Sequence, residues 1–215
     1  PFKLAKGGVD VFNDYDNVGL GKLMVGENRV NNVIAYKSPT LVGVPVTFMA
    51  AAVLSEEDKD ADVANTDIDE GANGYSASLA YDQNGVYLAA GYDNNIQSKT
   101  DSAWRLAGSV DMGKINMVPG LTLGALYQET DVADKSDDEK SWLVSGKYKI
   151  GATPWAVKAQ YIDTSNQSGV KDRGATEVAL GAEYTFNKAT KGHLYAAQID
   201  TDNVSDKTIV GGGLE

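Results

Sequence analysis

Hydrophobic and polar residues alternate along most of this chain with the period of two that is typical of β-strands. Near residue 145, for example, Trp142, Val144 and Tyr148 alternate with Ser145 and Lys147. The pattern predicts strands over 29–37, 43–53, 73–82, 86–94, 103–112, 120–128, 141–150, 155–163, 176–186, 193–200 and 207–215. Most of these ranges span about 9–11 residues, which exceeds the usual strand length of about 5–6 residues in globular proteins.

Each predicted strand has one apolar face and one mainly polar face. In the range 176–186, Val178 and Leu180 share one face, while Glu177 and Glu183 share the other. Aromatic residues stand near the ends of the apolar faces, at Tyr36, Tyr81, Tyr92, Tyr127, Tyr148, Trp155, Tyr161 and Tyr184. Such amphipathic rings are typical of the two interfaces between a membrane and water.

The connectors between the predicted strands alternate in length. The short ones are 38–42, 83–85, 113–119, 151–154 and 187–192, and the long ones are 54–72, 95–102, 129–140, 164–175 and 201–206. Outer-membrane barrels have short turns at one rim and long loops at the other, and a tilted strand of about 9–11 residues crosses the bilayer. We therefore predict a transmembrane antiparallel β-barrel. A soluble antiparallel sandwich uses the same alternation, but it does not explain these three features together.

Composition narrows the function. The 215-residue chain has a net charge of −11, which argues against nucleic-acid binding, and it has no cysteine. It has one histidine, His193, which excludes a two-histidine metal site, and which follows a short turn where we expect it at the membrane interface. No nucleotide-binding motif or nucleophile motif is present. We expect no enzymatic activity, no cofactor and no catalytic or metal site.

The most acidic stretch is 56–73. Asp58, Asp60, Asp62 and Asp69 have a spacing similar to that of a calcium-binding loop. Such a loop needs glycine at the position of Val63, a terminal glutamate and flanking helices. We therefore interpret this stretch as a solvated acidic loop, with divalent bridging to lipopolysaccharide phosphates as the alternative.

The stretch "VGENRVNNVIAYKSPTLVG", residues 25–43, resembles the segment that follows the third loop of Gram-negative general porins. Arg29 opens a strand, Tyr36 ends its alternating run, and Ser38-Pro39 leads to Gly43. The resemblance implies a single barrel domain, 1–215, from a trimeric sixteen-stranded porin. Residues 1–28 would be the inward-folded constriction loop and 29–215 the last eleven strands. We expect further residues beyond both ends, because the chain lacks an initiator Met and ends within a strand.

The resemblance also implies a constriction site. In this family, acidic residues of the third loop face basic residues on the opposite wall, and the field between them biases ion passage. The corresponding acids here are Asp10, Asp14, Asp16 and Glu27. Arg29 matches the wall arginine of the family, and alternation independently points it inward.

Alternation places four more charged residues on the inner wall: Arg105, Lys158, Glu177 and Glu183. We predict that they line the pore. Lys147 and Lys149 share this face close to a short turn, and there we favour simple solvation over a role in the pore.

Together these observations predict an outer-membrane porin for passive diffusion of ions and small hydrophilic solutes, with a mild cation preference. The resemblance implies a homotrimer, and we expect contacts with outer-membrane lipid and lipopolysaccharide. A sugar-selective channel is one alternative, which would need a line of aromatic residues in the lumen, where Tyr87 stands alone. A non-conducting structural or adhesin barrel is the other, and paired charges would plug its lumen.

Overall fold

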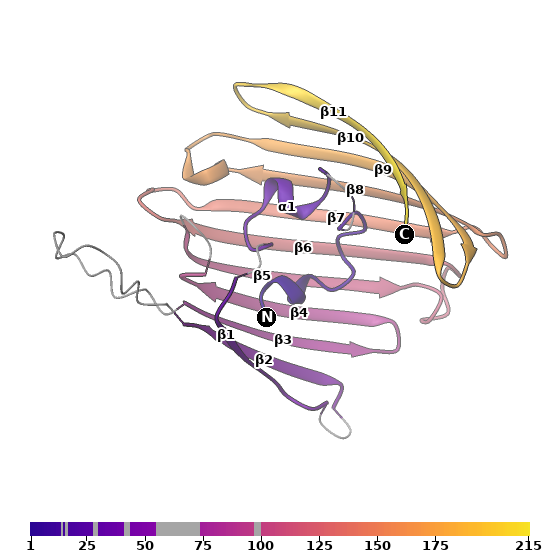
Figure 1. The fold of residues 1–215 in the computed structure, drawn as a ribbon, viewed down its shortest axis with the longest axis horizontal. Helices are drawn as coiled ribbons and strands as arrows, with labels where there is room; N and C mark the ends of the chain where they lie inside the picture. The colour runs from indigo at the N-terminus through magenta and orange to yellow at the C-terminus, as the bar shows by residue number, and fades with distance from the viewer. Residues whose placement is uncertain (14, 16, 28–29, 41–43, 55–73, 97–99) are drawn as a thin grey trace.

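The structure is a computed structural model that describes residues 1–13, 15, 17–27, 30–40, 44–54, 74–96 and 100–215. In this part of the chain, eleven strands follow one another (Figure 1). They are β1 (Val33–Lys37), β2 (Val46–Val53), β3 (Gly74–Gln83), β4 (Val86–Asn94), β5 (Thr100–Asp111), β6 (Leu121–Val132), β7 (Glu139–Lys149), β8 (Trp155–Ser165), β9 (Ala175–Asn187), β10 (Thr190–Thr201) and β11 (Val204–Leu214). The three helical turns are η1 (Lys3–Lys6), α1 (Leu20–Leu23) and η2 (Gln167–Gly169).

All eleven strands belong to one antiparallel sheet in which each strand pairs with its neighbours in the sequence. The prediction of an all-β antiparallel fold is confirmed. The sheet is not closed, because β1 and β11 form its two edges (Figure 1). None of the helices in the described part of the chain is long and apolar enough to cross a membrane.

The predicted strict alternation of short and long connectors is wrong. Residues 112–120 join β5 to β6, whereas only 202–203 join β10 to β11. The ladder between β10 and β11 continues as far as the pair Thr201 and Val204, so a tight turn replaces the predicted long loop. The connector 112–120 folds back on itself, with the Met117 amide donating to the carbonyl of Met112.

The sheet has two chemically different faces, as alternation predicted. We call the face against which residues 1–27 pack the inner face, and the opposite one the outer face. In β9, Val178 and Leu180 are exposed on the outer face, while Glu177 and Ala179 are buried on the inner face. Trp142 and Trp155 are 40% and 46% exposed, and no second sheet covers them in the described part of the chain.

Aromatic rings gather at both ends of the outer face. At the end where connectors join β6 to β7 and β8 to β9, the rings of Trp104 and Tyr127 lie 5.3 Å apart between centroids, and those of Trp142 and Tyr161 lie 5.1 Å apart. At the opposite end, the ring of Trp155 lies 4.8 Å from that of Tyr184. The spacing from Trp142 to Tyr148 on β7 is six residues, or about 20 Å along the strand.

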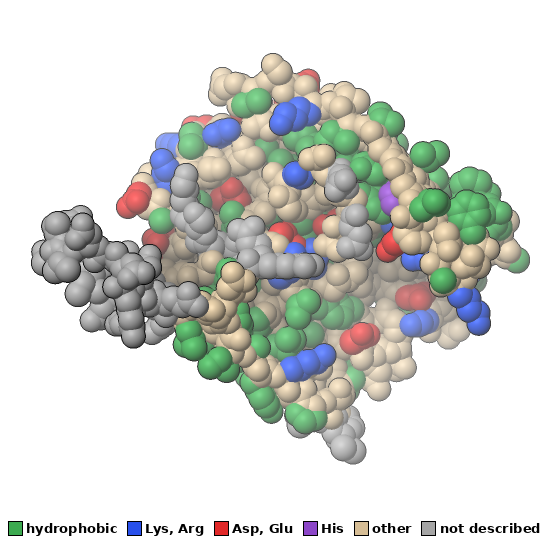
Figure 2. Space-filling view, in the orientation of Figure 1, with side chains coloured by type: hydrophobic (Ala, Val, Ile, Leu, Met, Phe, Trp, Pro, Cys, Tyr) green, Lys and Arg blue, Asp and Glu red, His purple; other side chains and the backbone are tan. Residues whose placement is uncertain are grey.

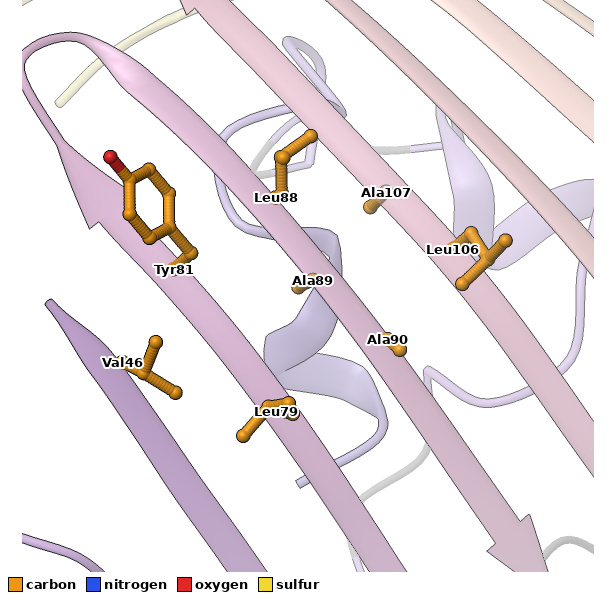
Figure 3. Close-up of a pocket in the computed structure, with 8 residues that line it drawn as sticks. All are labelled: Val46, Leu79, Tyr81, Leu88, Ala89, Ala90, Leu106 and Ala107. Atoms are coloured by element: carbon orange, nitrogen blue, oxygen red, sulfur yellow. The ribbon is translucent and has the colours of Figure 1, made fainter. Parts of the chain in front are cut away.

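Between these aromatic ends the outer face is apolar and shallowly grooved. One groove of about 390 Å³ has walls of large side chains such as Leu79, Leu88 and Leu106 and a floor of small ones such as Ala90 (Figure 3). In the close-up, the helical turn η1 lies behind the strands, so these side chains point away from the segment that covers the inner face.

The described residues among 1–27, which we call the N-terminal segment, lie across the inner face of the sheet (Figure 1). Two clusters of buried apolar side chains hold the segment there. The first joins Val9, Leu20, Leu23 and Met24 to wall residues that include Leu126, Leu143 and Ile162. The second joins Phe12, Tyr15 and Val18 to Ala179, Tyr195 and Ala197. The packed core of this protein therefore lies between the segment and the inner face.

Candidate functional site

The N-terminal segment is hydrogen-bonded to strands that are far apart in the sheet. Near its start, the amide of Phe2 donates to Ser76 Oγ on β3 over 3.0 Å. Further along, the amide of Gly19 donates to Glu177 Oε1 on β9 over 2.9 Å. The segment thus crosses the inner face from β3 to β9.

Two glycines in the wall let the segment approach the sheet closely. A Cβ atom added at Gly124 on β6 would lie 3.2 Å from the Cα of Val9, and one added at Gly181 on β9 would lie 2.8 Å from the ring of Phe12. A glycine within a strand often marks such a close approach of another backbone. Both positions therefore leave little room for a side chain between the wall and the segment.

Arg105 of β5 is the main polar anchor of the segment. Its guanidinium is completely buried, and its Nη1 lies 2.9 Å from Glu27 Oε1. Its Nε and Nη2 also donate to Gln128 Oε1, over 3.1 and 2.6 Å. The second oxygen of Glu27 pairs with Lys6, so the carboxylate is held between two cations. Because an unpaired buried arginine would be strongly destabilising, the segment supplies the counter-charge that the wall needs.

Asp10 stabilises the fold of the segment itself. Its Oδ1 accepts a hydrogen bond from the amide of Phe12 over 3.1 Å, and its Oδ2 accepts one from the amide of Leu20 over 3.1 Å. Gln160 Nε2 on β8 donates to Oδ1 over 3.1 Å. Burial raises the pKa of the Asp10 carboxyl above its ordinary value, although these hydrogen bonds act in the opposite direction.

A second set of ion pairs joins β7, β8 and β9 beside the segment. Glu183 of β9 pairs with Lys158 of β8 and with Lys147 of β7, whose Nζ lies 2.5 Å from Glu183 Oε2. The hydroxyl of Tyr15 donates to Glu183 Oε1 over 3.2 Å and accepts from Lys158 Nζ over 3.0 Å. Acidic and basic side chains accordingly stand close together in the middle of this face (Figure 2).

The structure places the predicted site residues as follows. Arg105, Lys158, Glu177 and Glu183 are on the inner face, where alternation put them, and all four are buried beneath or beside the segment. Their role in lining a pore stays a prediction.

The predicted constriction residues divide into two groups. The carboxylates of Asp10 and Glu27 contact the wall or the backbone of the segment. Asp14, Asp16 and Arg29 lie outside the described residues, and so does the acidic loop from residue 56 to residue 73. Whether any of these acids faces an open lumen also stays a prediction.

Several contact residues were not predicted. The hydroxyl of Tyr87 on β4 donates to the carbonyl of Ala5 over 3.1 Å, and Gln128 and Gln160 bind the segment as described above. His193 is a correction: its ring is on the inner face and stacks on Tyr15, with 4.1 Å between ring centroids. Alternation could have placed it inward, because the next residue in the sequence is an apolar one. In the structure, His193 pairs in register with Glu183, which is on the same face.

The chemistry of this site is that of ion pairs and hydrogen bonds. In the described part of the chain, no cluster of three or more histidine, cysteine, aspartate or glutamate residues could hold a metal ion. What the arrangement does physically is to fix a segment of chain, by charge pairs and apolar packing, across the inner wall of a curved sheet.

These features define a membrane β-barrel protein with a segment on its inner face. A comparison of the chain with known protein families identifies the family. A profile of the Gram-negative porin family matches residues 1–204. The chain belongs to the Gram-negative porins and is an outer-membrane protein. A search of curated proteins found no match.

Solved porin structures share the fold. The anion-selective porin from Comamonas acidovorans has a TM-score of 0.64 at 20% identity, over 86% of this chain and 55% of that one. The Salmonella typhi OmpF complex with daunomycin has a TM-score of 0.59 at 16% identity, over 85% and 61%. OmpT of Vibrio cholerae has a TM-score of 0.54 at 15% identity, over 85% and 61%. The chain thus spans little more than half the length of these proteins.

Proposed function

We propose that this chain forms the wall and the constriction of a water-filled outer-membrane channel for passive diffusion of ions and small hydrophilic solutes. The observation that carries the proposal is the N-terminal segment, which is fixed on the inner face from β3 to β9 by Arg105, Glu177 and the apolar clusters. A segment held inside a barrel narrows the passage without closing it, so that size sets the limit for solutes. The complete protein would be one barrel domain of sixteen strands.

The test is a planar-bilayer recording of the full-length protein. Stepwise conductance increments that scale with salt concentration support a water-filled channel. Currents that saturate with one sugar would support the substrate-selective alternative, and insertion without conductance would support a structural barrel. Tyr87, the inward aromatic residue on which a sugar path could begin, has its hydroxyl bound to the segment, which favours the general channel.

A mild cation preference is the finer part of the prediction. It needs acids that face the lumen, and the carboxylates of Asp10 and Glu27 are engaged with Gln160, Arg105 and Lys6. The preference would then depend on Asp14 and Asp16. Reversal potentials in a salt gradient measure it directly, and a potential of anionic sign would refute it.

We also propose a homotrimer in contact with outer-membrane lipid and lipopolysaccharide. Among the solved structures with this fold, one of OmpT from Vibrio cholerae is described as a trimer form. Cross-linking of the full-length protein in outer-membrane fractions tests this assembly, and a monomer as the sole product would contradict it.

A further inference from the structure

The aromatic rings of the outer face are distributed unevenly over β4, β5 and β6. At one end of the sheet each of these strands carries a ring, and the three are Tyr92, Trp104 and Tyr127. At the other end the last outer-face residues of the same strands are aliphatic, namely Val86, Val110 and Leu121. The flanking strands β3 and β7 carry Tyr81 and Tyr148 there. The row of aromatic rings therefore has a gap at this end, which we call the turn end.

The connector 112–120 lies at this gap, because it joins β5 to β6 at the turn end. Three of its large apolar side chains are exposed: Ile115 to 37%, Met117 to 61% and Val118 to 42%. Leu121, the first residue after the connector, pairs in register with Tyr148, so the connector begins at the level of that ring. Large apolar side chains that are exposed together mark a site of contact with a partner or a membrane.

The backbone of the connector is folded without help from these side chains. The amide of Met117 donates to the carbonyl of Met112 over 2.8 Å, and that of Leu121 donates to the carbonyl of Val118 over 3.3 Å. Asp111 Oδ1 accepts from the amides of Gly113 and Lys114 over 3.0 and 3.2 Å. The connector thus holds its apolar side chains at the surface in a fixed arrangement.

The charge of the connector differs from that of the rest of the chain. The chain has 30 acidic residues and a net charge of −11, yet no acid lies between Met112 and Leu121. The one charged residue in this range is Lys114, which is exposed and lies beside the tight turn at Gly85. A lysine at a membrane surface lays its stem along apolar groups and keeps its ammonium group among anionic headgroups. Apolar side chains with a cation and no acid therefore favour a lipid leaflet over a protein as the partner.

We propose that the connector 112–120 inserts Ile115, Met117 and Val118 into the lipid leaflet at the turn end, with Lys114 at the phosphates of that leaflet. The connector then takes the place of the rings that β4, β5 and β6 lack. Short turns of bacterial barrels face the periplasm, so the lipid is the phospholipid of the periplasmic leaflet. The proposal depends on the location in the outer membrane and is independent of conduction.

The experiment places an environment-sensitive fluorophore on the connector. The chain has no cysteine, so Met117→Cys gives one labelling site, once any cysteine that the full-length protein adds is replaced by serine. The labelled full-length protein is refolded into vesicles of phosphatidylethanolamine and phosphatidylglycerol. We expect emission at a short wavelength and quenching mainly by nitroxides on lipid acyl chains. Lys188→Cys is the control, because Lys188 is exposed in the tight turn between β9 and β10, where we expect quenching mainly by aqueous iodide.

A second comparison tests the cation. With the label at Met117→Cys, Lys114→Gln should reduce the lipid quenching in vesicles that contain phosphatidylglycerol and leave it unchanged in vesicles of phosphatidylcholine alone. An equal reduction in both lipids would contradict a role for the charge of Lys114. If Met117→Cys does not fold, Val118→Cys carries the label instead.

The possible outcomes separate the lipid from other partners. Iodide quenching at Met117→Cys as strong as at Lys188→Cys would place the connector in water and overturn the proposal. Short-wavelength emission with quenching by neither agent would mean that protein covers the connector, such as a second copy of the chain, and would also overturn it. A barrel that inserts without conducting, but whose label is quenched by lipid nitroxides, would overturn the proposed channel and leave the lipid contact in place.

Discussion

The guanidinium of Arg105 lies over the ring of Phe2, with 4.0 Å from its central carbon to the ring centroid. Phe2 begins the N-terminal segment, and Glu27, which pairs with the same guanidinium, ends it. One side chain of β5 thus binds both ends of the segment, through the face of an aromatic ring and through a carboxylate. The segment is closed into a loop over the wall at this point.

We predict that Arg105→Met loosens the segment. The substitution leaves Glu27 buried with Lys6 as its single cation and removes the ring contact, and breaking a buried ion pair typically costs about 3–5 kcal/mol. Unfolding of the detergent-refolded barrel by guanidinium chloride measures the loss, and single-channel recordings should show larger and noisier currents. Lys140→Gln is the control, because its partner Glu129 is on the exposed outer rim at 3.7 Å. Equal stability of the two variants would contradict the anchor.

We predict that Gly181→Ala displaces Phe12. The new methyl group would meet the ring at 2.8 Å, and such overpacking costs about 1–3 kcal/mol. Faster hydrogen exchange of the amides around Phe12 would report the displacement. Gly146→Ala is the matched control, because its methyl group would be in ordinary contact with Leu123 at 3.5 Å. If both variants exchange at the wild-type rate, the segment does not lie against Gly181.

The position of the segment should depend on pH through Asp10. Burial raises the pKa of this carboxyl in the folded state, so the folded protein holds the proton more tightly than the unfolded chain does. The stabilisation is therefore fully present below the ordinary aspartate pKa of about 3.9 and is lost as the pH rises through the raised value. Hydrogen exchange at the amides of Phe12 and Leu20, corrected for intrinsic rates, should show protection that falls over this range. Asp10→Asn should abolish that dependence, and an unchanged profile would exclude Asp10 as its source.

We predict that Val144→Arg is strongly destabilising in a bilayer. Val144 is exposed on the outer face between Trp142 and Tyr148, so an arginine there would enter hydrocarbon, at a cost of about 2–4 kcal/mol near the midplane. Folding of the barrel into lipid vesicles under denaturant titration gives the difference. Lys140→Arg keeps a cation beyond Trp142 and should fold like the wild type. A tolerated Val144→Arg would mean that this face does not contact lipid.

The sequence predicted the faces of the strands but not the contacts made on them. The alternation of Val178 with Glu177 is enough to assign each to a face, because side chains of a strand point to opposite sides with a period of two. Whether Glu177 then meets water or the amide of Gly19 depends on the path of the N-terminal segment. That segment has short helical turns and no long period, so its path could not be read from its pattern.

The same limit explains Leu143. Alternation put this apolar residue on the mainly polar inner face. The structure shows why an apolar residue is present there, because Leu143 belongs to the same buried apolar cluster as Val9 and Leu20. His193 shows the limit from the other side, since its place on the inner face follows from the register with Glu183, while its stacking on Tyr15 does not.

The reach of the N-terminal segment also bears on the order of assembly. The amide of Phe2 donates to a residue 74 positions later in the chain, and the amide of Gly19 donates to one 158 positions later. Contacts between positions so far apart form late, because the loops they close are long. The strands from β3 to β9 must therefore be in place before the segment can settle, so the inner face of the sheet is uncovered while the protein is still being built.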